Sequence, residues 1–372
     1  MSEISVNSIL DATGGATTTI NGFTPTVSNM AGRNRLINGG MGIDQRNAGA
    51  AVTVNSNVYN LDRWQTAVSQ AGKLTVQQNA GSVTPPSGFT NYLGYTSTSA
   101  YSVGTTEYFW FNQSIEGFNI ADLNWGTANA KTVTLSFQVY SSLTGTFGGA
   151  LQNSAQNRSY PFSYTVSLAN TWTSISVTIA GDTTGTWLTT NGIGIQVIFG
   201  LGIGLTSVNG TAGAWVGSQK NSVTGATSVV GTSGATFYIT GVQLEEGSVA
   251  TPFERRPIGQ ELALCQRYFQ KLGGTTTGEG LGSGNIQDAT NSCHVYVKYL
   301  TTMRAAPTAS YSSLQISNNA TYNLDVSSIR GQSNGTGSSN IAFNLSSDGT
   351  TFAAVQLKTS ATAGFLSYSA EI

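Results

Sequence analysis

Charged residues are scarce in this chain of 372 residues, where Asp, Glu, Lys and Arg together make up 9%. An average soluble domain contains roughly 25%. The 16 basic and 17 acidic side chains nearly cancel, which argues against the clustered Lys and Arg of a nucleic-acid-binding or membrane-surface protein. The most apolar stretch, 193–205, contains four glycines and is too short to span a bilayer. We therefore expect neither nucleic-acid binding nor membrane insertion.

Histidine and cysteine are almost absent. His294 is the single histidine, and Cys265 and Cys293 are the two cysteines. This composition argues against zinc sites and most histidine-dependent catalytic triads. Two cysteines form no disulfide framework, so we expect free, buried thiols. The polar start, residues 1–7, lacks the basic and apolar regions of a secretory signal.

Glycine, serine, threonine and asparagine fill the positions that charged residues leave, with 45 glycines alone. Such a surface is poor in strong helix formers and rich in residues that favour strands and turns. Hydrophobic residues at 39% and aromatic residues at 10% are enough to form a core. The composition therefore predicts an all-β protein.

Several segments show the alternation of apolar and polar residues that is typical of half-buried strands. The clearest are 133–139, 175–179, 193–199 and 237–244. In the last one the apolar phase shifts at Gly241, which predicts a β-bulge. Strands at this spacing with glycine-rich turns indicate an antiparallel jelly-roll β-sandwich.

The pattern divides the chain into four parts. Residues 1–35 are too polar to form a core and are predicted to be an extended arm that pairs with another chain or another protein, followed by a jelly roll over 36–256. A helical hinge is predicted over 257–273, and a smaller β domain over 274–372. The last part has about 100 residues, enough for a small sandwich.

The hinge segment breaks the strand rhythm. Its apolar residues follow spacings of four, three, four and three, which is the seam of a helix that packs on a partner: Ile258, Leu262, Cys265, Phe269 and Leu272. Pro257 stands at the start of this predicted helix and Gly273 at its end. The seam needs a partner, which is either its own domain or symmetry-related copies of the chain.

Several segments together resemble bacteriophage tail-fibre and receptor-binding proteins with a carbohydrate-binding-module-like jelly roll. The arm 6–15 (VNSILDATGG) resembles virion-attachment starts, and 254–271 (ERRPIGQELALCQRYFQK) resembles the hinge after such a jelly roll. Between them, the jelly-roll segments occur in the family's order: 32–49, 61–65, 112–117, 131–147, 170–187 and 237–254. The resemblance covers roughly residues 1–310.

This resemblance implies a homotrimer in the virion, on the phage tail or another surface appendage, assembled in the host cytoplasm. It also implies that the arm binds another virion protein and that the protein recognises a bacterial cell-surface glycan. Jelly rolls of the family often hold a structural Ca²⁺. Asn38 near the start and Glu245 near the end are weak candidate ligands here, with no calcium-loop motif around them.

Tryptophans are the candidate sugar platforms, because sugar-binding jelly rolls stack pyranose rings on exposed aromatic residues. Trp125, Trp187 and Trp215 lie beside Asn, Gly and Thr, and these turn positions make them the glycan-binding candidates. The other three tryptophans lie in or beside apolar strand patterns and are predicted to be core residues: Trp64, Trp110 and Trp172.

Catalytic residues are not predicted. Glycan hydrolysis usually needs two carboxylates at a fixed separation, and the adjacent pair Glu245–Glu246 would point to opposite faces of a strand. The remaining acids are scattered. We expect a non-enzymatic phage fibre protein that binds host glycan; the alternatives are a purely structural virion component (collar, baseplate or head-decoration subunit) without a ligand, and a tailspike-type depolymerase.

Overall fold

The computed structural model describes residues 32–204, 209–287, 291–318, 323–350 and 352–372. Contacts between residues divide the chain into two compact units, Met1–Arg256 with Ile372, and Pro257–Glu371. Most of the predicted arm, residues 1–31, lies outside the described residues.

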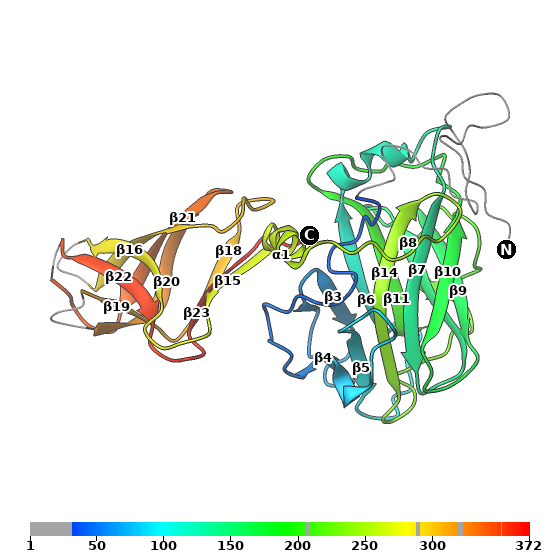
Figure 1. The fold of residues 1–372 in the computed structure, drawn as a ribbon, viewed down its shortest axis with the longest axis horizontal. Coiled ribbons are helices and arrows are strands. Elements are labelled where there is room, and N and C mark those ends of the chain that lie inside the picture. Colours follow the sequence, from blue (N-terminus) through cyan, green and yellow to red (C-terminus); the bar gives the residue numbers. More distant parts are fainter. Residues whose placement is uncertain (1–31, 205–208, 288–290, 319–322, 351) are drawn as a thin grey trace, which may run out of the picture. The chain divides into compact units, whose positions relative to one another are not determined.

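Within the described residues, the first unit contains two six-stranded antiparallel sheets (Figure 1). Sheet 1 has the order β1 (Val52–Thr53), β4 (Leu74–Gln78), β5 (Leu93–Ser97), β14 (Thr236–Glu246), β7 (Val133–Ser141) and β10 (Thr173–Ile179). Sheet 2 has the order β2 (Val58–Leu61), β3 (Trp64–Val68), β6 (Tyr108–Glu116), β11 (Ile193–Ile203), β8 (Gly145–Gln152) and β9 (Ser159–Val166). A short parallel pair adds β12 (Asn209–Gly210) and β13 (Ser222–Val223).

The alternation in the sequence places the core between the two sheets. On β7, Leu135 and Phe137 are buried while Ser136 and Gln138 are partly exposed. Phe111 from sheet 2 stacks on Phe199 of the same sheet, with ring centroids 5.0 Å apart, and both rings are fully buried. The predicted all-β jelly-roll sandwich is confirmed.

The predicted bulge in β14 is also confirmed. The register between β14 and β7 shifts between Thr240 and Gln243, which places Gly241 in the irregular stretch. Gly241 has a φ of 63°, a left-handed conformation that glycine adopts without steric cost.

The predicted boundary of the arm is too late. The backbone N–H groups of Gly32 and Asn34 donate to the Glu254 carboxylate, both at 2.7 Å, and the N–H of Arg35 donates to the carbonyl of Leu244. Residues 32–35 therefore belong to the first unit, because the Glu254 carboxylate and the Leu244 carbonyl, both more than 200 residues away, hold their backbone.

The second unit is a β domain. Among its described residues, six strands form a closed barrel: β16 (Gly280–Ile286), β17 (Ser292–Lys298), β21 (Ser338–Leu345), β20 (Asn323–Asn334), β19 (Leu314–Ser317) and β22 (Ala354–Thr359). A three-stranded sheet consists of β15 (Phe269–Gly273), β23 (Phe365–Ser369) and β18 (Thr308–Ser312). A small sandwich is the expectation for this domain, and it is wrong. β16 pairs with both β17 and β22, so the six strands close into a barrel.

The predicted helix is correct at its start and wrong at its end. α1 spans Ile258–Gln266, directly after Pro257, and the chain then forms β15. Phe269 and Leu272 are strand residues, paired with Ser369 and Leu366 of β23.

The five-residue seam therefore does not exist on one helix. Of its helical members, Cys265 is buried, Leu262 is partly exposed and Ile258 is 69% exposed. The hydrogen bonds that turn Phe269–Gly273 into a strand come from a partner about 100 residues away, which local periodicity does not reveal.

Both cysteines are free and buried, as predicted. Burial raises the pKa of Cys293 to about 12. The Cys293 thiol therefore stays protonated at neutral pH and packs as a small apolar side chain.

Candidate functional site

The outward face of sheet 1 carries a polar patch. Ser174 and Ser176 of β10 pair with Gln138 and Ser136 of β7, and directly paired residues point to the same face. Because residues of like orientation along one strand are about 7 Å apart, these four side chains form a compact polar rectangle.

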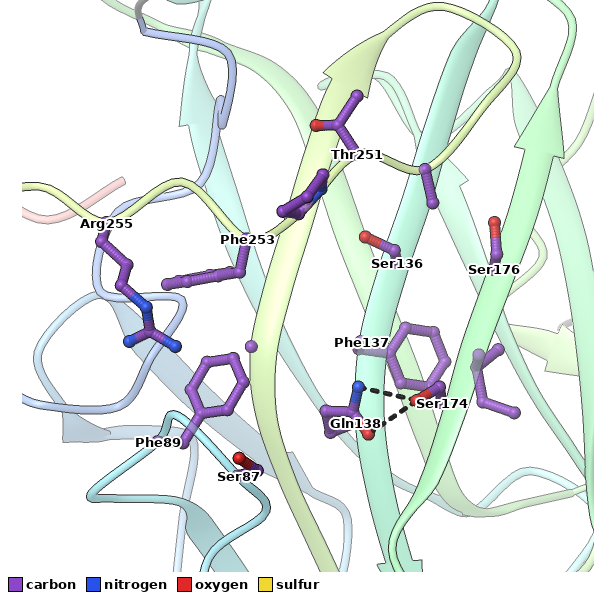
Figure 2. A pocket seen from close by; sticks show the side chains of 14 residues that line it. Ser87, Phe89, Ser136, Phe137, Gln138, Ser174, Ser176, Thr251, Phe253 and Arg255 are labelled. Atoms are coloured by element: carbon purple, nitrogen blue, oxygen red, sulfur yellow. Dashed lines mark hydrogen bonds between the residues drawn. The ribbon is translucent and has the colours of Figure 1, made fainter. Parts of the chain in front are cut away.

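A groove of about 420 Å³ lies over this rectangle. Figure 2 shows Ser136, Gln138, Ser174 and Ser176 on β7 and β10 as its floor. The groove is further lined by Gly241 of β14 and by loop residues, among them Ser87, Phe89, Thr251, Pro252, Phe253 and Arg255. The site is thus built from three sheet strands, β7, β10 and β14, and two loops of the first unit.

The amide at the centre of the floor is already oriented. Gln138 Nε2 donates to Ser174 Oγ at 2.8 Å, and Ser174 Oγ lies 3.0 Å from Gln138 Oε1 (Figure 2). A side chain whose rotamer is held before binding loses less entropy when a ligand arrives. The pair presents one amide and one hydroxyl to the groove.

Aromatic rings form the other end of the groove. Phe89 and Phe253 meet edge to face, with ring centroids 5.1 Å apart. The guanidinium of Arg255 lies 4.8 Å from the centre of the Phe89 ring and 5.7 Å from that of Phe253. Figure 2 shows these three side chains grouped beside β14.

The bulge at Gly241 makes this arrangement sterically possible. A Cβ at position 241 would lie 2.6 Å from Cζ of Phe89. That distance is far inside van der Waals contact, so Phe89 rests against the strand only because residue 241 has no side chain.

A second aromatic group lies on the same face of sheet 1. Tyr140 is the next outward position after Gln138 on β7, and it stacks on Tyr238 with centroids 5.4 Å apart. Tyr92 stacks on Tyr238 at 5.1 Å, and Trp172 lies edge-on to Tyr92. Tyr140 and Trp172 are partly exposed, so the aromatic surface continues along β7 beyond the groove.

The tryptophans predicted to bind glycan form a cluster of their own. The rings of Trp125, Trp187 and Trp215 lie edge to face, with centroids 4.8 to 5.4 Å apart. Trp125 and Trp187 are only 6% and 7% exposed. The prediction is wrong for these two residues, because a buried indole has no free face on which a sugar could stack. Trp215 is half-buried and is absent from the groove lining.

Each indole N–H of this cluster has a hydrogen-bond acceptor, which allows the rings to pack together although their sequence neighbours are typical of turns. Trp125 Nε1 donates to the carbonyl of Lys131, and Trp215 Nε1 donates to that of Ala180. Trp187 Nε1 donates to the Asp182 carboxylate at 3.2 Å. With its polar atom satisfied, each ring packs its apolar surface on the others.

The predictions for the other tryptophans are correct only in part. Trp64 is fully buried, as predicted. Trp110 and Trp172 are half-buried, with Trp110 stacked on Tyr108 and the indole N–H of Trp172 bonded to the carbonyl of Thr84.

Several acidic side chains of the first unit have structural partners. Asp122 pairs with Arg35 at 2.7 Å and Glu246 pairs with Lys131 at 3.0 Å. Asp182, almost fully buried, pairs with Arg158 through two hydrogen bonds. None of the residues described as lining the groove is Asp or Glu, so the groove holds no pair of carboxylates such as glycan hydrolysis uses.

The weak calcium candidates belong to separate hydrogen-bond networks. Asn38 donates to the carbonyls of Ile43 and Asp62, while Glu245 accepts from Gln243 and twice from Thr251. Among the described residues, no group of three or more His, Cys, Asp or Glu side chains is placed to hold a metal ion. Calcium binding by Asn38 and Glu245 stays a prediction, and it would require Glu245 to exchange its present donors.

Sequence reasoning proposed none of the groove residues as a binding site, although it identified the exposed face of one of the two floor strands. The outward polar phase of β7, with Ser136 and Gln138, is visible in the alternation of residues 133–140. Phe89, Phe253 and Arg255 lie in loops with no periodicity, and nothing in the sequence brings residue 89 near residue 253.

No protein-family model matches the chain, and no curated protein matches it in sequence. Among solved structures, it is similar to the enzymatically active domain of tailspike protein 4 of bacteriophage CBA120, with 11% identity and a TM-score of 0.32 over 57% of this chain and 21% of that chain. This chain thus spans about a fifth of that tailspike structure.

Two similar structures are carbohydrate-binding modules. One is TmCBM61 in complex with beta-1,4-galactotriose, with 10% identity and a TM-score of 0.29 over 57% of this chain and 99% of that one. The other is a family 11 module from Clostridium thermocellum in complex with a mixed-linked tetrasaccharide, with 14% identity and a TM-score of 0.27 over 54% and 97% of the two chains. At these scores the similarity carries no weight for function. In the part of the chain that the structure describes, no helix has the length and apolar character of a membrane span.

Proposed function

We propose that the first unit binds carbohydrate in the groove on sheet 1. The observation that carries this proposal is the combination of a polar floor, with Gln138 and Ser174 held in place, and the aromatic end formed by Phe89 and Phe253. A sugar ring has an apolar face that covers an aromatic surface and hydroxyl groups that exchange hydrogen bonds with amides and hydroxyls. Both partners are present within one groove.

We further propose a biological setting, a non-enzymatic fibre protein of a bacteriophage virion that recognises the host surface. Its support is the sequence resemblance of 6–15, 131–147 and 254–271 to tail-fibre and receptor-binding proteins. In that family the chain is a homotrimer, and three weak glycan sites on one particle give high avidity without tight binding at any one site. The arm would bind another virion protein.

Two alternative functions have less support. A purely structural virion component has no need of an open groove with an oriented amide. A depolymerase needs two carboxylates beside the scissile bond, and the residues described as lining the groove supply none.

The groove is tested by exchanging Gln138 for Ala. The variant loses the central amide, so we expect affinity for a bound glycan to fall about tenfold, which corresponds to one hydrogen bond of about 1.4 kcal/mol. Glycan-array binding of the purified full-length protein identifies the ligand, and calorimetric titration of that ligand measures the change.

The matched control is Gln196→Ala. Gln196 is a partly exposed glutamine on β11 of sheet 2 that also bonds a serine hydroxyl, with its Nε2 3.3 Å from Ser114 Oγ. We expect this variant to bind like the wild type. Equal losses in the two variants, or no loss in Gln138→Ala, would remove the groove from the proposal.

The virion setting is tested by truncation before Gly32, which leaves the contacts of Gly32 and Asn34 with Glu254 intact. We expect the shortened chain to fold, to have the mass of a trimer by light scattering, and to be missing from particles assembled in its presence. A monomer mass contradicts the trimer, and normal incorporation contradicts attachment through the arm.

A further inference from the structure

Arg255 is the single charged residue among those that line the groove. It is exposed, and its guanidinium is held over the rings of Phe89 and Phe253 by cation–π contacts. Its Nη2 also lies 2.8 Å from the position that a Cβ of Gly88 would take. The guanidinium therefore lies directly against the loop backbone at Gly88.

Glu254 and Glu245, two acidic residues close to Arg255 in the chain, are engaged elsewhere. Glu254 accepts from the backbone of Gly32 and Asn34 and pairs with Arg256 at 3.5 Å. Glu245 is buried and is bonded to Gln243 and Thr251. Neither carboxylate pairs with Arg255.

Other arginines of the first unit do have acidic partners. Arg35 pairs with Asp122, and Arg158 pairs with Asp182. Across residues 32–372, apart from the gaps at 205–208, 288–290, 319–322 and 351, no carboxylate forms a salt bridge with Arg255. Arg255 is thus an oriented cation at the edge of a groove that otherwise contains only neutral side chains.

We infer that the groove selects an acidic glycan, and that Arg255 binds a carboxylate of its sugar, as in a uronic or sialic acid. This inference rests on the proposed function and adds the class of ligand to it. A planar guanidinium matches a carboxylate with two parallel hydrogen bonds. The cation–π contacts with Phe89 and Phe253 hold the Arg255 guanidinium at the groove, where its N–H groups can donate to a ligand. The neutral hydroxyls and amide of the floor then bind the rest of the sugar.

The experiment compares one acidic oligosaccharide with its carboxyl-reduced form. An array of uronic-acid, sialic-acid, sulfated and neutral oligosaccharides selects the best acidic ligand, whose carboxylates are then reduced to primary alcohols. We expect the full-length protein to bind the reduced form about tenfold more weakly than the acidic form. Arg255→Gln should bind both forms with the weak affinity that the wild type has for the reduced form, and Arg255→Lys should fall between.

Arg46→Gln is the matched control. The guanidinium of Arg46 also stacks on an aromatic ring, 5.1 Å from the centre of Tyr59, but Arg46 is not among the groove-lining residues. It should keep the wild-type preference for the acidic form.

The outcomes separate this inference from the proposed function. Equal affinity for the acidic and reduced forms, a preference for neutral or sulfated glycans, or an unchanged preference in Arg255→Gln would each overturn the acidic ligand while carbohydrate binding stands. Absence of binding to every glycan would overturn both.

Discussion

Replacing Trp187 with Ala should destabilise the first unit by about 3–5 kcal/mol, the usual cost of removing a buried tryptophan. Trp187 is 7% exposed and contacts Trp125 and Trp215 edge to face, with ring centroids 4.8 and 5.4 Å away. Its removal leaves a cavity beside both rings and takes one donor from Asp182. For a unit of this size, the midpoint of thermal unfolding should fall by roughly 6–20 °C.

The control is Trp110→Ala, because Trp110 is half-buried on β6 and its indole contacts Tyr108 at 6.2 Å. Its melting temperature should fall much less. A Trp187→Ala variant that melts within about 2 °C of the wild type would show that the ring is not part of the core, and would restore it as a sugar platform.

Replacing Asp182 with Asn should cost about 3–5 kcal/mol at neutral pH, because it leaves the charge of Arg158 without its partner. The Asp182 side chain is 2% exposed and that of Arg158 is 19% exposed, and their closest atoms are 2.5 Å apart. Asp182 also accepts from the N–H and hydroxyl of Thr184 and from Trp187. Chemical unfolding of the variant and the wild type measures the difference.

The difference in unfolding free energy between the wild type and Asp182→Asn depends on pH, and the pKa of Asp182 determines the direction of this dependence. Burial alone raises the pKa of Asp182, but hydrogen bonds from Arg158 and Thr184 outweigh it and hold the pKa below its ordinary value of 3.8. The folded state therefore favours the carboxylate more than the unfolded state does. The stabilisation is fully present above pH 3.8 and is lost as the pH falls through the lowered pKa, so the two proteins should converge in stability at strongly acidic pH.

Asp122→Asn provides the comparison for Asp182. Asp122 pairs with Arg35 at the same kind of distance, 2.7 Å, but its side chain is 42% exposed. The Arg35 side chain is 13% exposed, but water reaches the Asp122 carboxylate, so we expect this pair to contribute only about 1 kcal/mol. Equal effects of the two substitutions at neutral pH would contradict the assignment of Asp182 to a buried ion pair.

The loops that line the groove show the limit of sequence reasoning most clearly. The alternation along β7 is enough to mark Ser136 and Gln138 as surface residues. Phe89 and Arg255, in contrast, meet because two loops that are far apart in the first unit's sequence come together beside β14. Loops carry no repeating pattern, so their meeting point depends on how the sheets are ordered.

The glycan-binding prediction for Trp125 and Trp187 is wrong for a related reason. Trp125, Trp187 and Trp215 have polar and glycine neighbours in sequence, which is typical of exposed turns. Their burial depends on one another, since each ring covers the other two. The neighbours of a residue in sequence indicate its backbone conformation. The exposure of a large ring depends instead on which distant segments pack against it.

By itself, the sequence determined the properties that follow from local composition and period: an all-β chain, the inward and outward phases of its strands, the bulge at Gly241 and a helix that begins after Pro257. Only the tertiary structure decided what depends on pairing between distant segments. It made Phe269–Gly273 a strand of β23's sheet, closed the second unit into a barrel and brought Arg255 to the groove. The physical reason is that side-chain period acts over a few residues, while strand pairing and burial join residues that are far apart in the chain.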